Sequence, residues 1–192
     1  KHIKRNNIEG DLVECGVWKG GNLILFKKML EKLNLDKKIF AFDTFQGMPE
    51  PGKEDFDLKN NNAGNIYENY KKKDIKWCFS NLNEVKTNIG KHFEDYEKNF
   101  NFIEGKVEET LVIEKNLPQK ISLLRLDTDF YESTKKELEI LYPRLNKGGV
   151  LIIDDYGHWK GSKKAVDEYF NLNQNFLWFH RIDYASRLYI KQ

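Results

Sequence analysis

The sequence predicts an α/β fold in which a mostly parallel sheet carries helices on both faces. Strand-like and helix-like runs alternate along the chain, the runs before Asp127 and Asp154 are strongly apolar, and a strand-like pair closes the C-terminus. Uninterrupted apolar strands are typical of parallel sheets buried on both sides, and alternating elements require crossover connections. A chain of 192 residues can bury a real core, so we expect one domain that spans residues 1–192.

Seven strands are expected, recognised as short apolar runs between polar or turn-forming residues. The first five are Asp11–Val17, Lys38–Phe42, Asn101–Glu104, Ile121–Leu126 and Val150–Ile153. The last two runs, Phe176–Ile182 and Ser186–Lys191, are close enough in sequence to form an antiparallel pair. The expected architecture is therefore a Rossmann-like sheet, mostly parallel, with an antiparallel C-terminal strand.

Helices are expected between these strands. An amphipathic pattern predicts one from about Gly21 to Leu33, a second covers about Ser133–Leu141, and a third includes Ala165–Phe170. Residues 44–99 are irregular and rich in loop signals, with one short helix expected near Asn81. A segment this long inside a compact domain is usually functional, so we interpret it as a lid or substrate loop.

Carboxylates follow two of the predicted strands where each strand ends. Asp127 and Asp129 follow the fourth strand, and Asp154 and Asp155 directly follow the fifth. Like charges gathered at one sheet edge either share protons or hold a cation, and oxygen ligands favour Mg²⁺ over zinc. We predict that Asp127, Asp154 and Asp155 bind the ion and that Asp129 is a general base. The alternatives are solvated loop acids for the Asp pair and a helix N-cap for Asp129.

A glycine loop joins the first strand to the first helix. Glu14, Gly16 and Gly20, with Trp18 between the glycines, do not fit the dinucleotide pattern G-x-G-x-x-G. They match the acidic-first glycine loop of S-adenosylmethionine sites, where the backbone approaches the amino-acid part of the cofactor. The alternative is an ordinary turn between strand and helix.

Asp43 ends the second strand and is followed by Thr44. Nucleotide-binding folds place a carboxylate there because it accepts hydrogen bonds from both ribose hydroxyls. A strand-end aspartate also forms turns. His158, just after the Asp pair, is a second candidate base if it lines the pocket, and otherwise belongs to a surface turn.

Composition excludes several classes of protein. The formal charge of +2 and the mixture of lysines with acids argue against a nucleic-acid surface. No apolar run is long enough to span a membrane. Cys15 and Cys78 lie in apolar surroundings and are expected to be buried free thiols, so we expect a soluble, cytoplasmic protein.

Four motifs in this order resemble the macrocin O-methyltransferase family of antibiotic-sugar methyltransferases, from about Gly10 to Phe170. They lie within Val13–Gly21 (VECGVWKGG), Phe42–Pro49 (FDTFQGMP), Leu124–Thr134 (LRLDTDFYEST) and Leu141–Gly157, which ends in IDDYG. The resemblance implies the seven-stranded methyltransferase sheet and a cation-dependent transfer from S-adenosylmethionine to a sugar hydroxyl. Two residues depart from the pattern, with Thr128 in place of a glycine and Phe130 in place of a leucine.

The resemblance also implies roles for individual residues. Asp127, Asp154 and Asp155 would bind Mg²⁺, and Asp129 would be the base. The acceptor would be a small molecule or glycan that carries a sugar hydroxyl. In the family, an N-terminal extension covers the site and builds oligomer contacts, and this sequence does not include it. We therefore expect a homo-oligomer only because the resemblance implies one. The implied cofactor contacts are Glu14, Gly16, Trp18, Gly20, Asp43, Thr44, Gly105, Lys106 and Val107, the last three within the third-strand end Phe102–Val107.

Three other classes compete with this interpretation. A cation-dependent methyltransferase of a catechol or other diol would use the same chemistry with a different pocket shape. A nicotinamide-dependent oxidoreductase is disfavoured by the absent dinucleotide pattern. A non-catalytic binding module of the same fold is disfavoured because every key acid is present.

Overall fold

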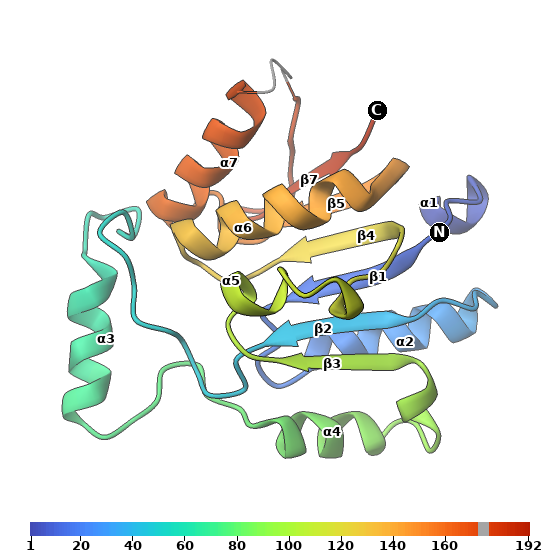
Figure 1. Cartoon of the computed structure of the whole chain (residues 1–192), viewed down its shortest axis with the longest axis horizontal. Coiled ribbons are helices and arrows are strands. Elements are labelled where there is room, and N and C mark those ends of the chain that lie inside the picture. Colours follow the sequence, from blue (N-terminus) through green and yellow to red (C-terminus); the bar gives the residue numbers. More distant parts are fainter. Residues whose placement is uncertain (173–176) are drawn as a thin grey trace.

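A seven-stranded sheet with helices on both faces forms the centre of the computed structural model, which describes residues 1–172 and 177–192 (Figure 1). The strand order is β3-β2-β1-β4-β5-β7-β6. Neighbours from β3 to β5 are parallel, and β7 runs antiparallel to both β5 and β6. The predicted fold class is confirmed. The strands are β1 (Asp11–Cys15), β2 (Ile39–Asp43), β3 (Phe100–Glu104), β4 (Ile121–Leu126), β5 (Leu145–Ile153), β6 (His180–Arg181) and β7 (Arg187–Ile190).

Helices cover the two faces of the sheet with separate apolar clusters. One cluster packs α2 and α4 against β1, β2 and β3, and the other packs α5, α6 and α7 against β4, β5 and β7. Figure 1 shows α3 apart from both layers, beyond the carboxyl ends of the parallel strands. The helices are α1 (His2–Arg5), α2 (Gly21–Lys32), α3 (Ala63–Lys72), α4 (Leu82–Gly90), α5 (Val107–Thr110), α6 (Tyr131–Leu141) and α7 (Lys160–Leu172).

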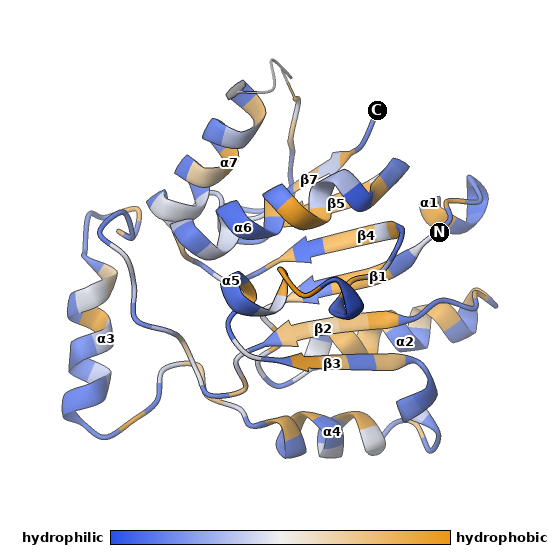
Figure 2. Ribbon diagram, in the orientation of Figure 1, coloured by the Kyte–Doolittle hydropathy of each residue, from blue (hydrophilic) through white to orange (hydrophobic). Residues whose placement is uncertain are grey.

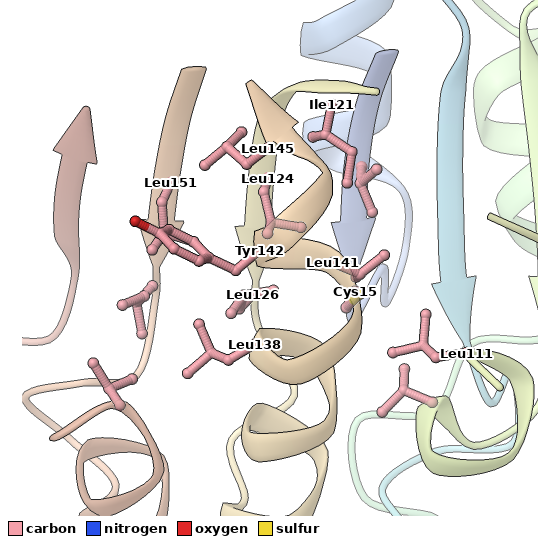
Figure 3. Packing of buried hydrophobic residues seen from close by; sticks show 14 of the residues in the cluster. Cys15, Leu111, Ile121, Leu124, Leu126, Leu138, Leu141, Tyr142, Leu145 and Leu151 are labelled. Atoms are coloured by element: carbon pink, nitrogen blue, oxygen red, sulfur yellow. The ribbon is translucent and has the colours of Figure 1, made fainter. Parts of the chain in front are cut away.

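The core is made from alternating strand residues and one side of each helix. In the close view of Figure 3, Leu138 and Leu141 of α6 lie over Leu124 and Leu126 of β4. These four side chains are at most 2% exposed, and burial of each contributes about 1.5–3 kcal/mol to stability. Figure 2 shows the same division along the chain, with apolar strands inside and a largely hydrophilic α3 outside.

Several predicted boundaries shift by a few residues, and two of them are wrong for local reasons. β1 ends at Cys15 rather than Val17, because Gly16 turns the chain with a left-handed φ of 83°. β5 begins at Leu145, so the glycines at 148 and 149 lie inside the strand and not in a turn before it. The pairing of β4 with β5 shifts register there, as expected for a bulge that accommodates them. Phe176, the predicted start of the C-terminal pair, lies outside the described residues, and of the described part of that predicted strand only His180 and Arg181 form β6.

Residues 44–99 contain more helix than the loop signals indicate. α4 begins as predicted, since the Asn81 side chain accepts a hydrogen bond from the backbone N–H of Glu84 at 2.8 Å. α3 is missed, because Asn62 reads as a loop residue but is the N-cap whose side chain accepts from Asn65. Within the described part of the chain, no helix is long and apolar enough to cross a membrane.

Both cysteines are free, but only one of them is buried. Cys15 packs in the core beneath α6, as predicted. Cys78 is exposed, which contradicts the expectation, because it belongs to neither core cluster and faces the pocket described below.

Candidate active site

The loops after β1, β2, β3 and β4 surround one pocket of about 190 Å³ at the carboxyl edge of the sheet. Parallel strands end at the same edge, and the reversal of strand order beside β1 leaves a crevice there. Cys78 lines the pocket from the segment before α4. Nine of the residues predicted as site residues lie in its wall: Gly16, Trp18, Asp43, Thr44, Gly105, Lys106, Val107, Asp127 and Asp129.

Gly16 allows the ends of β1 and β4 to approach closely. Its φ of 83° is left-handed, and a Cβ at this position would overlap the backbone oxygen of Asp127. Hydrogen bonds on both sides fix the loop, from Gly16 N–H to the Phe42 carbonyl at 2.9 Å and from Asp127 N–H to the Cys15 carbonyl at 2.9 Å. Only glycine satisfies both the conformation and the contact.

Asp43 ties the glycine loop to the end of β2. One carboxylate oxygen accepts hydrogen bonds from the N–H groups of Val17 at 2.6 Å and Trp18 at 3.1 Å. The other accepts from Phe45 N–H at 2.7 Å. The carboxylate therefore has the turn-forming role considered as an alternative, while it also lies in the pocket wall beside Thr44.

The acidic cluster consists of Asp127, Asp154 and Asp155. A carboxylate oxygen from each lies within 4.8 Å of those of the other two. Burial and the neighbouring Asp154 and Asp155 raise the pKa of Asp127 to about 9 although Arg125 opposes the shift. A carboxyl group shifted in this way is one that a bound cation would return to its ionised form.

Asp129 lies between the pocket and the acidic cluster. Its backbone N–H donates to Asp155 at 3.3 Å, and the two carboxyl groups hydrogen-bond to each other. Burial, together with the neighbouring Asp127 and Asp154, raises the pKa of Asp129 above its usual range, and a carboxyl with a raised pKa is a better proton acceptor. The N-cap alternative is wrong, because Phe130 is the N-cap of α6 and makes no side-chain capping bond.

Arg125 was overlooked in the sequence, although a cation inside an apolar strand is a signal. Its guanidinium contacts Glu14 at 2.9 Å, Asp127 at 2.5 Å and Asp154 at 2.8 Å. Its side chain is 12% exposed and that of Glu14 is 1% exposed. One buried cation thus offsets part of the charge of three carboxylates from β1, β4 and β5.

Glu14 does not line the pocket but lies buried beside it. Oε1 is paired with Arg125 and the Asn22 side chain also hydrogen-bonds to the carboxylate, while Oε2 has no partner of normal geometry among the described residues. Burial raises the pKa of Glu14 to about 7, against the opposing charge of Arg125. Native structures rarely leave a buried carboxylate oxygen unsatisfied, so this atom is suited to an added donor.

Besides Glu14, four predicted residues lie outside the pocket wall: Asp154 and Asp155, which belong to the acidic cluster, and Gly20 and His158. Gly20 is the N-cap of α2, where a Cβ would lie 3.1 Å from Val85 of α4, so the glycine serves helix packing. The His158 ring packs edge-on against Trp159 and lies 3.5 Å from the Tyr184 hydroxyl. The structure therefore places His158 in a surface turn and not with Asp129.

Asp55 is a buried carboxylate that the sequence reasoning missed. It accepts hydrogen bonds from Gly52 N–H at 2.7 Å and from Tyr131 N–H, the first residue of α6, at 2.8 Å. It thereby satisfies an open donor at the helix start. Met48 lines the pocket and also packs on a neighbouring aromatic group of Trp77, Phe130 and Trp159.

This sheet order, with a glycine loop, a strand-end carboxylate and an acidic cluster around one crevice, defines the methyltransferase class of Rossmann-like domains. The sequence profile described as macrocin-O-methyltransferase (TylF) matches residues 1–191. The chain belongs to the macrocin O-methyltransferase family, as the four motifs predicted. This membership rules out the nicotinamide-dependent oxidoreductase.

Individual relatives support the assignment. The demethyldecarbamoylnovobiocin O-methyltransferase of Streptomyces niveus is 34% identical over 173 residues, which are 85% of this chain and 59% of the relative. A Streptomyces olivaceus enzyme, 8-demethyl-8-(2,3-dimethoxy-alpha-L-rhamnosyl)-tetracenomycin-C 4'-O-methyltransferase, is 33% identical over 87% of this chain and 60% of its own. The chain thus spans about three fifths of the length of these relatives.

Solved structures agree with the fold. The O-methyltransferase NovP superposes with a TM-score of 0.83 at 30% identity, over 100% of this chain and 75% of NovP. The calicheamicin methyltransferase CalS11 superposes with a TM-score of 0.70 at 21% identity, over 98% of this chain and 74% of CalS11, which supports the fold alone.

Proposed function

We propose that this chain transfers the methyl group of S-adenosylmethionine to a sugar hydroxyl of a small molecule or glycan, with the help of a divalent cation. The observation that carries the proposal is the acidic cluster beside a pocket walled by the glycine loop and Asp43. A methyl donor and a cation-bound acceptor could meet there at one sheet edge. Family membership supports the reaction class.

The wall residues fit S-adenosylmethionine. Gly16 leaves its loop backbone open to the amino-acid part of the donor, and the buried carboxylate of Glu14, only partly satisfied by Arg125 and Asn22, could accept a further hydrogen bond. Asp43 and Thr44 lie in the wall that would face the ribose. Backbone N–H groups already occupy Oδ2 of Asp43 twice and Oδ1 once, so Oδ1 is the oxygen that would accept a ribose hydroxyl. Gly105, Lys106 and Val107 form the wall after β3 that would hold the adenine.

The acidic cluster fits a hard divalent cation. Its donors are all oxygens, and Arg125 occupies one oxygen each of Asp127 and Asp154, Oδ2 and Oδ1, so that the other oxygen of each can act as a ligand. Mg²⁺ bound there would lower the pKa of an acceptor hydroxyl and fix its oxygen. Asp129 would take the proton from that hydroxyl on its carboxylate. His158, which lies outside the wall, is the weaker candidate.

The segment 44–99 would cover the acceptor. Its Met48 and Pro49 face the pocket, and Asp55 anchors it to the start of α6. Aromatic and apolar side chains beside this wall would bind the apolar face of a sugar ring. The Streptomyces olivaceus relative acts on a rhamnosyl group, which supports a glycosylated natural product as the acceptor class.

The test is a panel of acceptors incubated with S-adenosylmethionine and Mg²⁺ and followed by mass spectrometry. The panel contains glycosides, nucleotide sugars, surface polysaccharides, lipid-linked glycans and a catechol. A gain of one methyl mass on a sugar-bearing acceptor, abolished by EDTA, is the expected result. Methylation of the catechol alone would show that the acceptor is a catechol and not a sugar. Failure to bind S-adenosylhomocysteine would favour a non-catalytic module.

A further inference from the structure

The backbone that carries Asp129 is held in a strained turn. Asp129 has a φ of 68°, and the N–H of Phe130 donates to the Thr128 carbonyl at 2.8 Å across this one residue. Together these define a γ-turn with positive φ, a conformation that residues with a Cβ rarely adopt. Such strain persists only where surrounding contacts hold it, and it gathers at functional sites.

Helix α6 supplies the contacts that hold this turn. The Ser133 hydroxyl donates to the carbonyls of Thr128 at 3.3 Å and Phe130 at 3.1 Å. The Thr128 hydroxyl donates to Oε1 of Glu137 at 2.9 Å. Ser133 and Glu137 are four residues apart and buried on one side of α6, so both meet the turn from the same direction.

Glu137 is a costly residue at this position. Its side chain is completely buried, it forms no ion pair within the described chain, and its Oε2 has no hydrogen-bond partner there. The Cys15 thiol also hydrogen-bonds to the carboxyl group, and burial holds the pKa of Glu137 well above its usual range. An apolar side chain would avoid the cost of burying a carboxyl, so its visible contributions are the bonds to the Cys15 thiol and to Thr128, and only the second reaches the turn that carries Asp129.

We propose that Glu137 is a positioning residue that acts through Thr128 to hold Asp129 in the pocket wall. This inference rests on the proposed function, in which Asp129 takes the acceptor proton. Thr128 stands between the cation ligand Asp127 and Asp129, so its side chain sets the backbone of both. Ser133 adds a second contact to the same turn and would act with Glu137.

The test compares Glu137→Leu, which removes the acceptor, with Thr128→Val, which removes the donor at nearly constant shape. Each is expected to lower kcat by about tenfold or more, which is about 1.4 kcal/mol of activation free energy. KM for S-adenosylmethionine should change little in Glu137→Leu, because Glu137 does not line the pocket, whereas Thr128 does, so the KM readout applies to the Glu137 variant. The double variant should be no worse than either single one, since both remove the same bond.

Rescue and control variants separate positioning from folding. Glu137→Gln keeps an acceptor oxygen for Thr128 and should retain several times the kcat of Glu137→Leu. Glu139→Leu, on the exposed side of the same helix, should leave kcat unchanged. Thermal unfolding of Glu137→Leu should be no lower than that of the unsubstituted protein, because the buried carboxyl is gone.

Hydrogen exchange of the 127–131 peptide, read by mass spectrometry without substrates, gives a result independent of activity. Exchange should be faster in Glu137→Leu and Thr128→Val and unchanged in Glu139→Leu. Unchanged exchange or unchanged kcat in the first two variants would overturn the inference. Faster exchange in a protein that methylates no acceptor would instead keep the structural role and overturn the proposed function.

Discussion

Arg125 and Glu14 lie directly opposite each other on β4 and β1 and form a buried ion pair of 2.9 Å. Opposed residues of neighbouring strands project from the same sheet face, so the register itself brings these two side chains together. Asp127 projects from that face as well, two residues beyond Arg125, and Asp154 joins from β5. A single guanidinium therefore connects the proposed cofactor side of the site with the proposed cation side.

Replacement of Arg125 by methionine is expected to lower the free energy of unfolding by about 3–5 kcal/mol, because it leaves buried Glu14 without its cation. The matched control is Arg144→Met, since Arg144 pairs at 2.8 Å with the exposed Glu114 and should contribute less than about 1 kcal/mol. Urea denaturation measures both. Equal losses would mean that burial of the Arg125 pairs is energetically irrelevant.

Asp154→Asn is expected to weaken Mn²⁺ or Mg²⁺ binding by at least about tenfold, because one of three ligand charges is removed. Isothermal titration of the metal without acceptor measures this directly. Asp95→Asn is the control, since Asp95 is 81% exposed and pairs only with Lys98 among the described residues. Full methyl transfer by Asp154→Asn that EDTA does not inhibit would show that the cation role is wrong.

Asp129→Asn is expected to lower kcat by about 10²–10⁴-fold, the usual contribution of a general base. His158→Gln should lower it far less, because His158 packs against Trp159 and Tyr184 away from the pocket wall. Steady-state kinetics with saturating donor separates the two. The reverse order of effects would transfer the base role to His158.

Gly16→Ala is expected to abolish S-adenosylhomocysteine binding or folding, because the new Cβ would overlap the Asp127 backbone at a left-handed φ. Gly21→Ala tests the specificity of this effect, since a Cβ at Gly21 meets nothing within 4 Å in the first turn of α2. That change should stabilise the protein slightly, by up to about 1 kcal/mol. Thermal shift with S-adenosylhomocysteine distinguishes the two variants.

The buried carboxyl of Glu137 should make the free energy of unfolding depend on pH. Burial raises the pKa of Glu137 in the folded protein well above the usual range. Between the unfolded and folded pKa values, Glu137 is therefore ionised in the unfolded chain and protonated in the folded one. The free energy of unfolding should therefore fall as pH rises above about 4.3, and Glu137 alone should account for at most about 1.4 kcal/mol of that fall per pH unit.

Glu137→Gln should remove that part of the slope and gain most stability at the higher pH. Unfolding free energies from about pH 5 to about pH 7 test this linkage. Glu139→Gln on the exposed side of α6 serves as the reference. A slope that is equal in the two variants would contradict a neutral, buried Glu137.

The sequence by itself determined the sheet and the edge at which the site lies. Short apolar runs in this sequence form strands, and β4 has the predicted ends, Ile121 and Leu126. The carboxyl ends of parallel strands meet at one edge whatever the rest of the chain does. Asp127, Asp154 and Asp155 were therefore brought together as predicted from local pattern alone.

The tertiary structure alone decided which side chains are partners. The position of β4 between β1 and β5 makes Arg125 the common partner of Glu14 and Asp154. The packing of residues 44–99 on α6 buries Asp55, and the turn after β5 leaves His158 outside the pocket. Periodicity and turn chemistry act between residues a few positions apart, whereas these contacts depend on strand order and helix packing that join distant parts of the chain.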